Sequence, residues 1–286
     1  MLAVGDPLQQ HDEGMKIAME QQRPRKLPPP VTVIVPCFNE DEGIPSLMGR
    51  LSALQADGGR GWEVLLVDDG SDDLTFARLL SYSRTYPWVR VLRHPTNLGL
   101  GAALRTGIEH AQAPIICAID SDCTYPPERL PELVRLLDDG SEIATASAWH
   151  PESQAAEGSK FRIMLSRAVS GCYKVLIGQD VHTFTCLFRA YRADALRRVP
   201  FRADGFAAVA EIMLRSMLAG YRVRELPMRL EKRKFGESKL KVGDAIAAHA
   251  GLLSMTAALV GSRWLRERFR RRPDDMAAPS SERPAA

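Results

Sequence analysis

Residues 113–122 read Ala113-Pro-Ile-Ile-Cys-Ala-Ile-Asp120-Ser-Asp122, a short apolar run that ends in two aspartates. A β-branched run of this length that opens after a proline predicts a buried strand. The carboxyl ends of strands form the ligand-binding edge of an open α/β sheet, so both carboxylates are expected there. Two such close carboxylates repel each other unless a cation lies between them, and Mg²⁺ prefers oxygen ligands. The alternative is an Asp pair that caps the helix opened by Pro126-Pro127.

Two earlier segments follow the same plan. The apolar run 31–35 leads into Pro36-Cys-Phe-Asn-Glu40, and the run 62–67 leads into Asp68-Asp-Gly-Ser71. Pro36 ends its strand because proline has no backbone N–H to donate. The Asp68 carboxylate is suited to accept hydrogen bonds from a ribose hydroxyl or a base N–H; alternatively it caps the helix that begins near Asp73. Three strands that each deliver polar residues to one edge predict a shared site.

The string Asp-Asp-Gly-Ser occurs a second time, at residues 138–141. This copy follows residues 130–137, whose apolar side chains recur at helical spacing. It therefore predicts a helix C-terminus that Gly140 stops. The position of the string after a strand, and not the string itself, indicates a functional site.

The order of elements predicts an α/β fold with a mainly parallel sheet and helices on both faces. The expected strands lie near residues 31–36, 62–67, 88–92, 114–119, 142–148, 183–191 and 221–227. Helices are expected between the first four strands, after the fourth, and near residues 159–177 and 206–219. The stretch from Asn97 to Gly107 contains Gly-x-Gly without the dinucleotide-binding spacing, so it predicts a tight turn before a helix and does not indicate NAD.

Composition bounds the class of protein. The chain has 286 residues, of which 45% are hydrophobic and 26% charged, as in ordinary globular proteins. Its five cysteines lack Cys-x-x-Cys spacing, which favours free thiols in a reducing compartment. Residues 1–30 are polar without an apolar signal segment and are expected to form a disordered arm. Residues 273–286 are expected to be a disordered tail.

The positive charge is concentrated near the C-terminus. Residues 222–272 hold fourteen Lys and Arg against five Asp and Glu, whereas the whole chain has a net charge of +3. This segment predicts an anion-binding surface for phosphates or acidic lipid. Nucleic acid is not expected as a partner, because no aromatic residues are interleaved with the basic ones. Residues 242–272 predict an amphipathic, basic helix that either lies at a membrane interface or packs on the domain.

Taken in order along the chain, the motifs resemble glycosyltransferase family 2, most closely its dolichol- and polyprenyl-phosphate mannosyltransferases. The motifs that carry the resemblance are Val-Pro-Cys-Phe-Asn-Glu40, Val-Asp68-Asp-Gly-Ser, Asn97-x-Gly-x-Gly, Asp120-Ser-Asp122 and Arg233-Lys-Phe-Gly-Glu-Ser-Lys239-Leu. The resemblance implies one GT-A domain over residues 31–241, followed by the C-terminal helix.

The resemblance also implies roles for individual side chains. The nucleoside pocket would be lined by Pro36, Phe38, Glu40 and Asp68. Mg²⁺ or Mn²⁺ on the donor diphosphate would be held by Asp120 and Asp122. The acceptor phosphate would be bound by Arg162 and Ser166, and phosphates would be clamped by Arg233 and Lys239. Arg162 is alternatively a solvated residue on a helix face, and residues 232–241 alternatively form a simple turn.

The implied activity is inverting, metal-dependent transfer of a hexose, preferably mannose, from a nucleotide-diphosphate sugar to a polyprenyl (dolichyl) phosphate. The protein would act in the cytoplasm as a peripheral protein at the membrane face. One alternative keeps the fold but uses a hydroxyl acceptor with Glu211 as the base, unless Glu211 simply pairs with Arg215. A second alternative is a non-catalytic module that binds a nucleotide sugar.

The chain departs from the resembled subgroup at several positions. Thr124 stands where Gln is common after the Asp pair, and Ser147-Ala-Trp149 stands where Ser-Arg-Tyr would supply an arginine for the acceptor phosphate. The stretch from Asp180 to Arg192 is longer than usual and carries His182, which we expect to be a hydrogen-bonded structural histidine.

Overall fold

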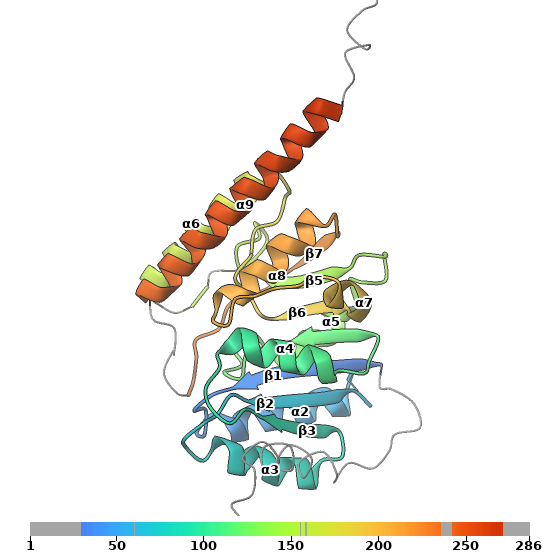
Figure 1. Ribbon diagram of the computed structural model, residues 1–286. Coiled ribbons are helices and arrows are strands. Elements are labelled where there is room, and N and C mark those ends of the chain that lie inside the picture. The colour runs from blue at the N-terminus through green and yellow to red at the C-terminus, as the bar shows by residue number, and fades with distance from the viewer. Residues whose placement is uncertain (1–29, 60, 155, 158, 236–241, 271–286) are drawn as a thin grey trace, which may run out of the picture.

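The computed structural model describes residues 30–59, 61–154, 156–157, 159–235 and 242–270. In this part of the chain seven strands form one sheet in the order β3-β2-β1-β4-β6-β5-β7 (Figure 1). The strands are β1 (Val31–Cys37), β2 (Glu63–Asp68), β3 (Val89–Arg93), β4 (Ile115–Ala118), β5 (Ile143–Ser147), β6 (Arg189–Arg192) and β7 (Val223–Pro227).

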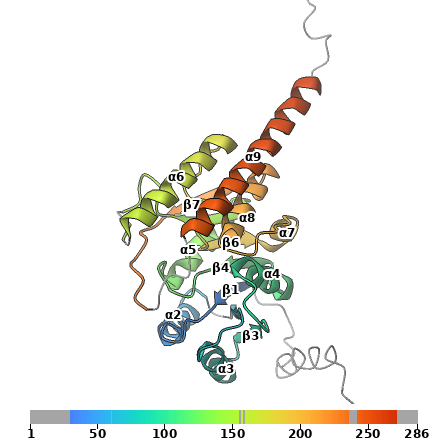
Figure 2. The same cartoon turned by 60° about the vertical axis from the view of Figure 1, so that its left-hand side comes forward.

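Helices cover both faces of the sheet, each with its own apolar core (Figure 2). One face packs against α2 (Ile44–Ala56), α3 (Thr75–Thr85) and, after the 3₁₀ turn Pro127–Arg129, α5 (Leu130–Arg135). The other face packs against α4 (Leu100–His110), α7 (Ala193–Arg197) and α8 (Ala207–Leu218). Two long helices, α6 (Lys160–Ile177) and α9 (Val242–Arg270), lie side by side beyond α8.

The sheet register brings the predicted polar residues to one edge. β1 runs parallel to β2 and to β4, with Cys37 opposite Asp68 and Ile34 opposite Ala118. β6 runs antiparallel to both β4 and β5, and β7 returns parallel to β5. The predicted fold class is confirmed: a mainly parallel α/β sheet with helices on both faces and a C-terminal helix.

The predicted strand 183–191 was wrong in its first part, because only Arg189–Arg192 form β6. The backbone N–H groups of His182 and Thr183 donate to the Glu225 carboxylate at 3.0 Å. The Phe184 carbonyl accepts a hydrogen bond from Arg189 at 2.6 Å. Side chains therefore satisfy backbone groups that a strand would have paired with a neighbouring strand.

Helix α9 packs on α6 and α8 along part of its length. Leu252 and Thr256 are buried at this contact, and His249 Nδ1 lies 2.9 Å from the Tyr173 hydroxyl of α6. Among the described residues, no helix is both long and apolar enough to cross a bilayer. The segments predicted to be disordered, 1–30 and 273–286, lie outside the described residues except for residue 30, and so does Lys239.

Candidate active site

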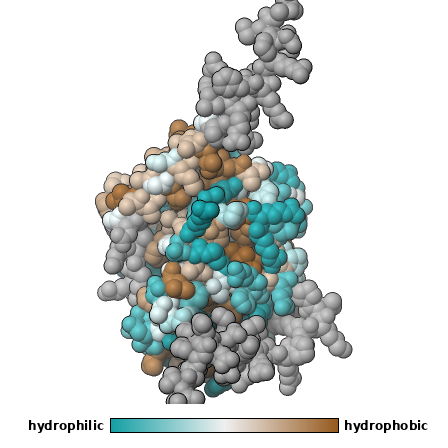
Figure 3. Space-filling view, viewed as in Figure 1, coloured by the Kyte–Doolittle hydropathy of each residue, from teal (hydrophilic) through white to brown (hydrophobic). Residues whose placement is uncertain are grey.

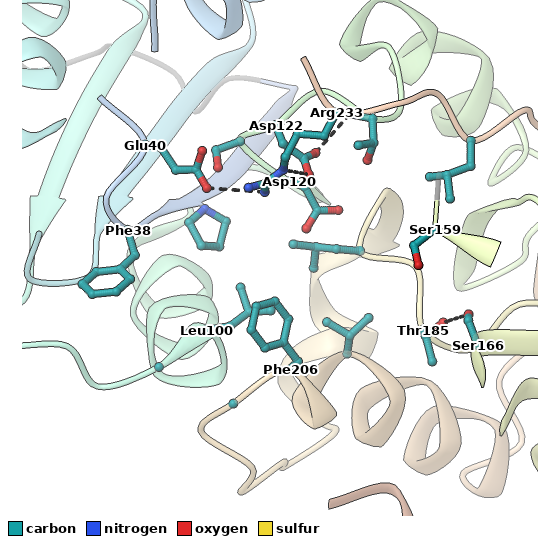
Figure 4. Close-up of a pocket in the computed structure, with 18 of the residues that line it drawn as sticks. Phe38, Glu40, Leu100, Asp120, Asp122, Ser159, Ser166, Thr185, Phe206 and Arg233 are labelled. Atoms are coloured by element: carbon teal, nitrogen blue, oxygen red, sulfur yellow. Dashed lines mark hydrogen bonds and ion pairs between the residues drawn. The ribbon is translucent and has the colours of Figure 1, made fainter. Parts of the chain in front are cut away.

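The ends of β1, β2 and β4 open onto a cavity of about 920 Å³ (Figure 4). Its polar end is lined by carboxylates that follow these strands, namely Glu40, Asp69, Asp120 and Asp122. Its apolar end reaches helices α6 and α8, where Ile163, Val169 and Val209 line it. One continuous cavity thus joins an acidic site to an apolar chamber.

The Asp120–Asp122 pair forms the acidic centre of this site. Burial and the neighbouring Asp122 charge raise the pKa of Asp120 to about 7, although Arg233 opposes the shift. The Asp122 carboxylate accepts a hydrogen bond from the Thr124 N–H at 3.0 Å, which fixes the turn after β4. A buried carboxyl group beside a second carboxylate marks a place where added positive charge is favourable.

Arg233 supplies such charge from the segment that follows β7. Its Nε donates to Asp122 Oδ2 at 2.9 Å, and its second amino group lies 3.4 Å from Glu40 Oε1 (Figure 4). The segment is held across the site because the Glu231 N–H donates to the Thr124 carbonyl at 2.9 Å. Arg233 therefore bridges the polar ends of β1 and β4.

The two aspartates after β2 have different roles. Asp68 is fully buried, does not line the cavity, and contacts Arg93 Nε at 3.1 Å; burial raises its pKa. Asp69 does line the cavity, and its carboxylate accepts the N–H groups of Leu98 and Gly99 at 3.0 and 2.8 Å. Asp69 thereby holds the turn before α4, which forms one wall of the cavity.

Uncharged polar groups line the cavity between its acidic centre and α6. The Ser166 hydroxyl lies 2.8 Å from that of Thr185 and accepts the Trp149 indole N–H at 3.3 Å. All three residues line the cavity. Arg162 lies on α6, one turn before Ser166, but its side chain is outside the described part of the structure.

Two buried charged residues near the site have partners of their own. Glu211 accepts the N–H groups of Arg202 and Ala203 and a hydrogen bond from Arg215 Nε at 2.6 Å. Burial tends to raise the pKa of Glu211, but these donors outweigh it and hold that pKa below the ordinary value. Arg189 is fully buried, donates to the carbonyls of Phe184 and Val209 at 2.6 Å, and exerts a favourable charge on Asp120.

The structure brings most of the predicted site residues together around this cavity. Those that line it are Pro36, Phe38, Glu40, Asp120, Asp122, Ser166 and Arg233. Sequence reasoning missed Asp69, Trp149 and Thr185. Adjacent residues of a strand face opposite sides, so Asp68 and Asp69 are not both expected to face the cavity, but the sequence does not indicate which of them does. No comparable pattern marks Thr185.

Solved structures show the same fold. Glucosyl-3-phosphoglycerate synthase from Mycobacterium tuberculosis, in complex with Mn²⁺, uridine diphosphate and its product, aligns with a TM-score of 0.62 at 18% identity. The alignment covers 91% of this chain and 86% of that protein. The fold is therefore GT-A.

Sequence comparison is more specific than the fold. The model of glycosyl transferase family 2 matches residues 32–199, more than half of the chain, so the chain belongs to this family. It is 30% identical over 214 residues to an undecaprenyl-phosphate 4-deoxy-4-formamido-L-arabinose transferase of Salmonella paratyphi A and to a dolichol-phosphate mannosyltransferase of Pyrococcus furiosus. These alignments cover 73% and 74% of this chain but only 62% and 59% of the relatives.

Proposed function

We propose that this protein transfers a sugar from a nucleotide-diphosphate donor to a polyprenyl phosphate with inversion at the anomeric carbon. The observation that carries the proposal is the single cavity whose acidic end holds the Asp120–Asp122 pair and whose opposite end is apolar. A charged donor and a lipid-linked acceptor need these two environments side by side. The names of the two relatives, which both describe polyprenyl-type phosphate acceptors, support this proposal.

The Asp pair suits a hard divalent cation, Mg²⁺ or Mn²⁺. Both ligands are carboxylates, and the pKa of Asp120 is raised first by burial and then by the Asp122 charge, whose repulsion such a cation relieves. When bound there, a divalent cation neutralises charge on the donor diphosphate and so assists its departure. Asp120 and Asp122 would hold the ion, while Arg233 lies close enough to share the neutralisation of the phosphates.

The protein side chains then position two anions for one displacement. A phosphate oxygen of the acceptor forms a bond to the anomeric carbon, and the bond from that carbon to the diphosphate oxygen breaks. The nucleoside diphosphate leaves with the electron pair. The acceptor phosphate is already an anion near neutral pH, so positioning matters more than a general base. Glu211, the base of the hydroxyl-acceptor alternative, is outside the cavity lining and already bonded to three donors.

Ser166, Arg162 and Lys239 remain proposed contacts of the acceptor or its phosphates. Ser166 lines the cavity where its polar and apolar parts meet. Trp149 occupies the neighbourhood in which the subgroup would supply an arginine, and its indole N–H is a neutral donor. We expect Arg162 to provide the compensating charge from the preceding turn of α6.

Apolar side chains on the two long helices support attachment to a membrane surface. Phe161, Met164 and Val175 of α6 and Ile246 of α9 are largely exposed, and apolar residues gather along this side of the molecule (Figure 3). An interfacial position would hold the apolar end of the cavity near the lipid. The proposed location is the cytoplasmic face, with α6 and α9 against the bilayer.

A donor panel tests the proposal. Full-length protein is incubated with polyprenyl phosphate, Mg²⁺ and radiolabelled nucleotide sugars, including mannosyl and pentosyl donors, and label in the organic phase is measured. We expect one donor to label the lipid, with mannose preferred. Asp122→Ala should lower the rate at least about 100-fold, whereas Asp138→Ala, an exposed control, should not.

Two outcomes would contradict the proposal. Label that enters only water-soluble hydroxyl acceptors would exclude the lipid acceptor. Full turnover after removal of divalent cations with EDTA would exclude the metal role of the Asp pair.

A further inference from the structure

A second group of possible metal ligands lies outside the acidic centre. His150, His182 and Glu225 each offer one ligand atom, and these three atoms lie within 4.8 Å of one another. The three side chains come from different parts of the chain: the turn after β5, the segment before β6, and β7 itself. The fold, and not a local sequence motif, therefore brings them together.

An ion at this place would bind in exchange for hydrogen bonds that the side chains now make. His150 Nδ1 accepts the Glu152 N–H at 3.2 Å, and an ion would compete with this long hydrogen bond for the one lone pair of the neutral ring. His182 Nδ1 donates to Glu225 Oε2 at 2.7 Å, so an ion between these two atoms would replace the shared proton. The two imidazole rings meet edge to face with their centroids 5.3 Å apart. Glu225 is fixed in place by the backbone N–H groups of His182 and Thr183, both at 3.0 Å.

Two charged side chains, Asp180 and Lys174, lie next to His182. Asp180 Oδ1 lies 3.6 Å from His182 Nε2, too far for a hydrogen bond in this structure, and would move closer to accept one from the Nε2–H when Nδ1 serves as the ligand. A carboxylate behind a histidine ligand fixes its ring and increases its basicity. Lys174 also approaches His182 Nε2, at 3.0 Å, but its ammonium lies closer to Asp180 Oδ1, at 2.6 Å. The Asp180 ion pair can retain Lys174 once Nε2 carries the proton.

We propose that His150, His182 and Glu225 bind a divalent transition-metal ion of the Zn²⁺ class. Two imidazoles and one carboxylate suit Zn²⁺, which binds such ligands at about 2.0–2.2 Å, with a fourth position left to water. The Asp120–Asp122 pair, with carboxylate oxygens alone, suits a harder ion. The two sites therefore take different metals.

The position of this site gives it a structural consequence. His150 directly follows Trp149, and His182 stands three residues before Thr185, and both of these neighbours line the cavity. An ion that ties the β5 turn, the segment before β6 and β7 together would fix the indole and hydroxyl groups near the proposed acceptor phosphate. The ion would stabilise the wall of the cavity and would not contact the reacting atoms.

Zinc binding is measured on full-length protein without an affinity tag. All variants carry Cys172→Ser, because Cys172 is the exposed thiol among the described cysteines. The protein is stripped with a chelator, placed in excess Mg²⁺ to occupy the oxygen site, and titrated with Zn²⁺ against a chromophoric chelator. We expect one Zn²⁺ per chain, and Co²⁺ in its place should give the visible absorption of a low-coordinate nitrogen–oxygen site.

Matched variants locate the ion. His150→Ala and Glu225→Gln should each weaken Zn²⁺ binding by about 10- to 100-fold or more. His110→Ala should keep full affinity, because His110 lies at the end of α4, where its Nδ1 bonds the Thr106 carbonyl of the same helix at 2.8 Å. Asp122→Asn should also retain the Zn²⁺, since it alters the other site.

Each contrary result would overturn the assignment. The proposal fails if the His110→Ala protein binds no stoichiometric Zn²⁺, or if His150→Ala and Glu225→Gln bind it as tightly as their parent. It fails equally if Asp122→Asn abolishes the binding. Circular dichroism checks the fold of each variant, and His150→Ala is the decisive one, because a turn residue with one side-chain hydrogen bond is expected to be replaced without unfolding.

Discussion

The string Asp-Asp-Gly-Ser occurs at residues 68–71 and 138–141, in two environments that differ in almost every respect. The first copy ends β2, and both of its aspartates are buried. The second follows α5, and both of its aspartates are exposed. Asp69 accepts two backbone N–H groups from the turn before α4, whereas Asp139 Oδ1 accepts the nearby Ser141 N–H at 2.9 Å.

The glycines of the two copies share a backbone conformation but not a neighbourhood. Gly70 has φ +70° and Gly140 has φ +86°, both in the region that favours glycine. A methyl group on Gly70 would overlap the backbone of Thr96 and Asn97, whereas on Gly140 it would meet the flexible end of the Arg222 side chain. The same four residues thus lie beside the candidate cavity in one place and form a surface turn in the other.

Replacing each glycine should give the largest difference in stability between the two copies. Gly70→Ala should destabilise the protein by about 2–5 kcal/mol, since a positive φ costs about 1–2 kcal/mol and overpacking adds about 1–3 kcal/mol. Gly140→Ala should lose only about 1–2 kcal/mol, from φ alone. Urea unfolding of both variants measures the difference, and equal losses would show that the two turns are equivalent.

Replacing the second aspartate of each copy should give the next largest difference, in stability and in donor binding. Asp69→Ala leaves two partly buried N–H groups without their acceptor, so a loss of about 2–4 kcal/mol and reduced donor binding are expected. Asp139→Ala should change stability much less, because Asp139 is exposed and its acceptor role is confined to the local turn. Thermal unfolding and donor titration measure both effects; normal donor binding by a folded Asp69→Ala protein would remove Asp69 from the site.

The smallest contrast is in the pH dependence of stability. Burial raises the pKa of Asp68, so the folded chain holds an extra proton above the unfolded value of about 3.9, and stability falls as the pH rises through that window. The Ser141 hydroxyl and N–H lower the pKa of Asp139, so its contribution is present above the unfolded value and is lost as the pH falls.

The two asparagine variants should therefore shift stability in opposite senses. Asp68→Asn should gain stability relative to the parent on going from about pH 4 to about pH 7. Asp139→Asn should lose stability relative to the parent over the same change. Urea titrations at the two pH values decide the matter, and shifts of the same sign would contradict the contrasting environments.

The sequence alone predicts much of the difference between the two copies of Asp-Asp-Gly-Ser. The apolar runs before Asp68 and Asp120 predict strands, the helical spacing before Asp138 predicts a helix end, and the structure has both. The choice of Asp69 over Asp68 was missed, because it depends on which face of the sheet each residue meets at the end of β2. The irregular stretch 183–188 was missed too, because distant side chains, Glu225 and Arg189, satisfy its backbone groups.

Arg189 and Arg233 act on Asp120 through different media. Arg233 has about a quarter of its side chain exposed, so dissolved ions can weaken its attraction for the carboxylate. Arg189 has no exposed surface, so dissolved ions weaken its attraction for Asp120 less. Rising ionic strength should therefore weaken the Arg233 part of the positive potential at the acidic centre more than the Arg189 part. The buried arginine keeps part of the electrostatic support of Asp120 at salt concentrations that weaken the rest.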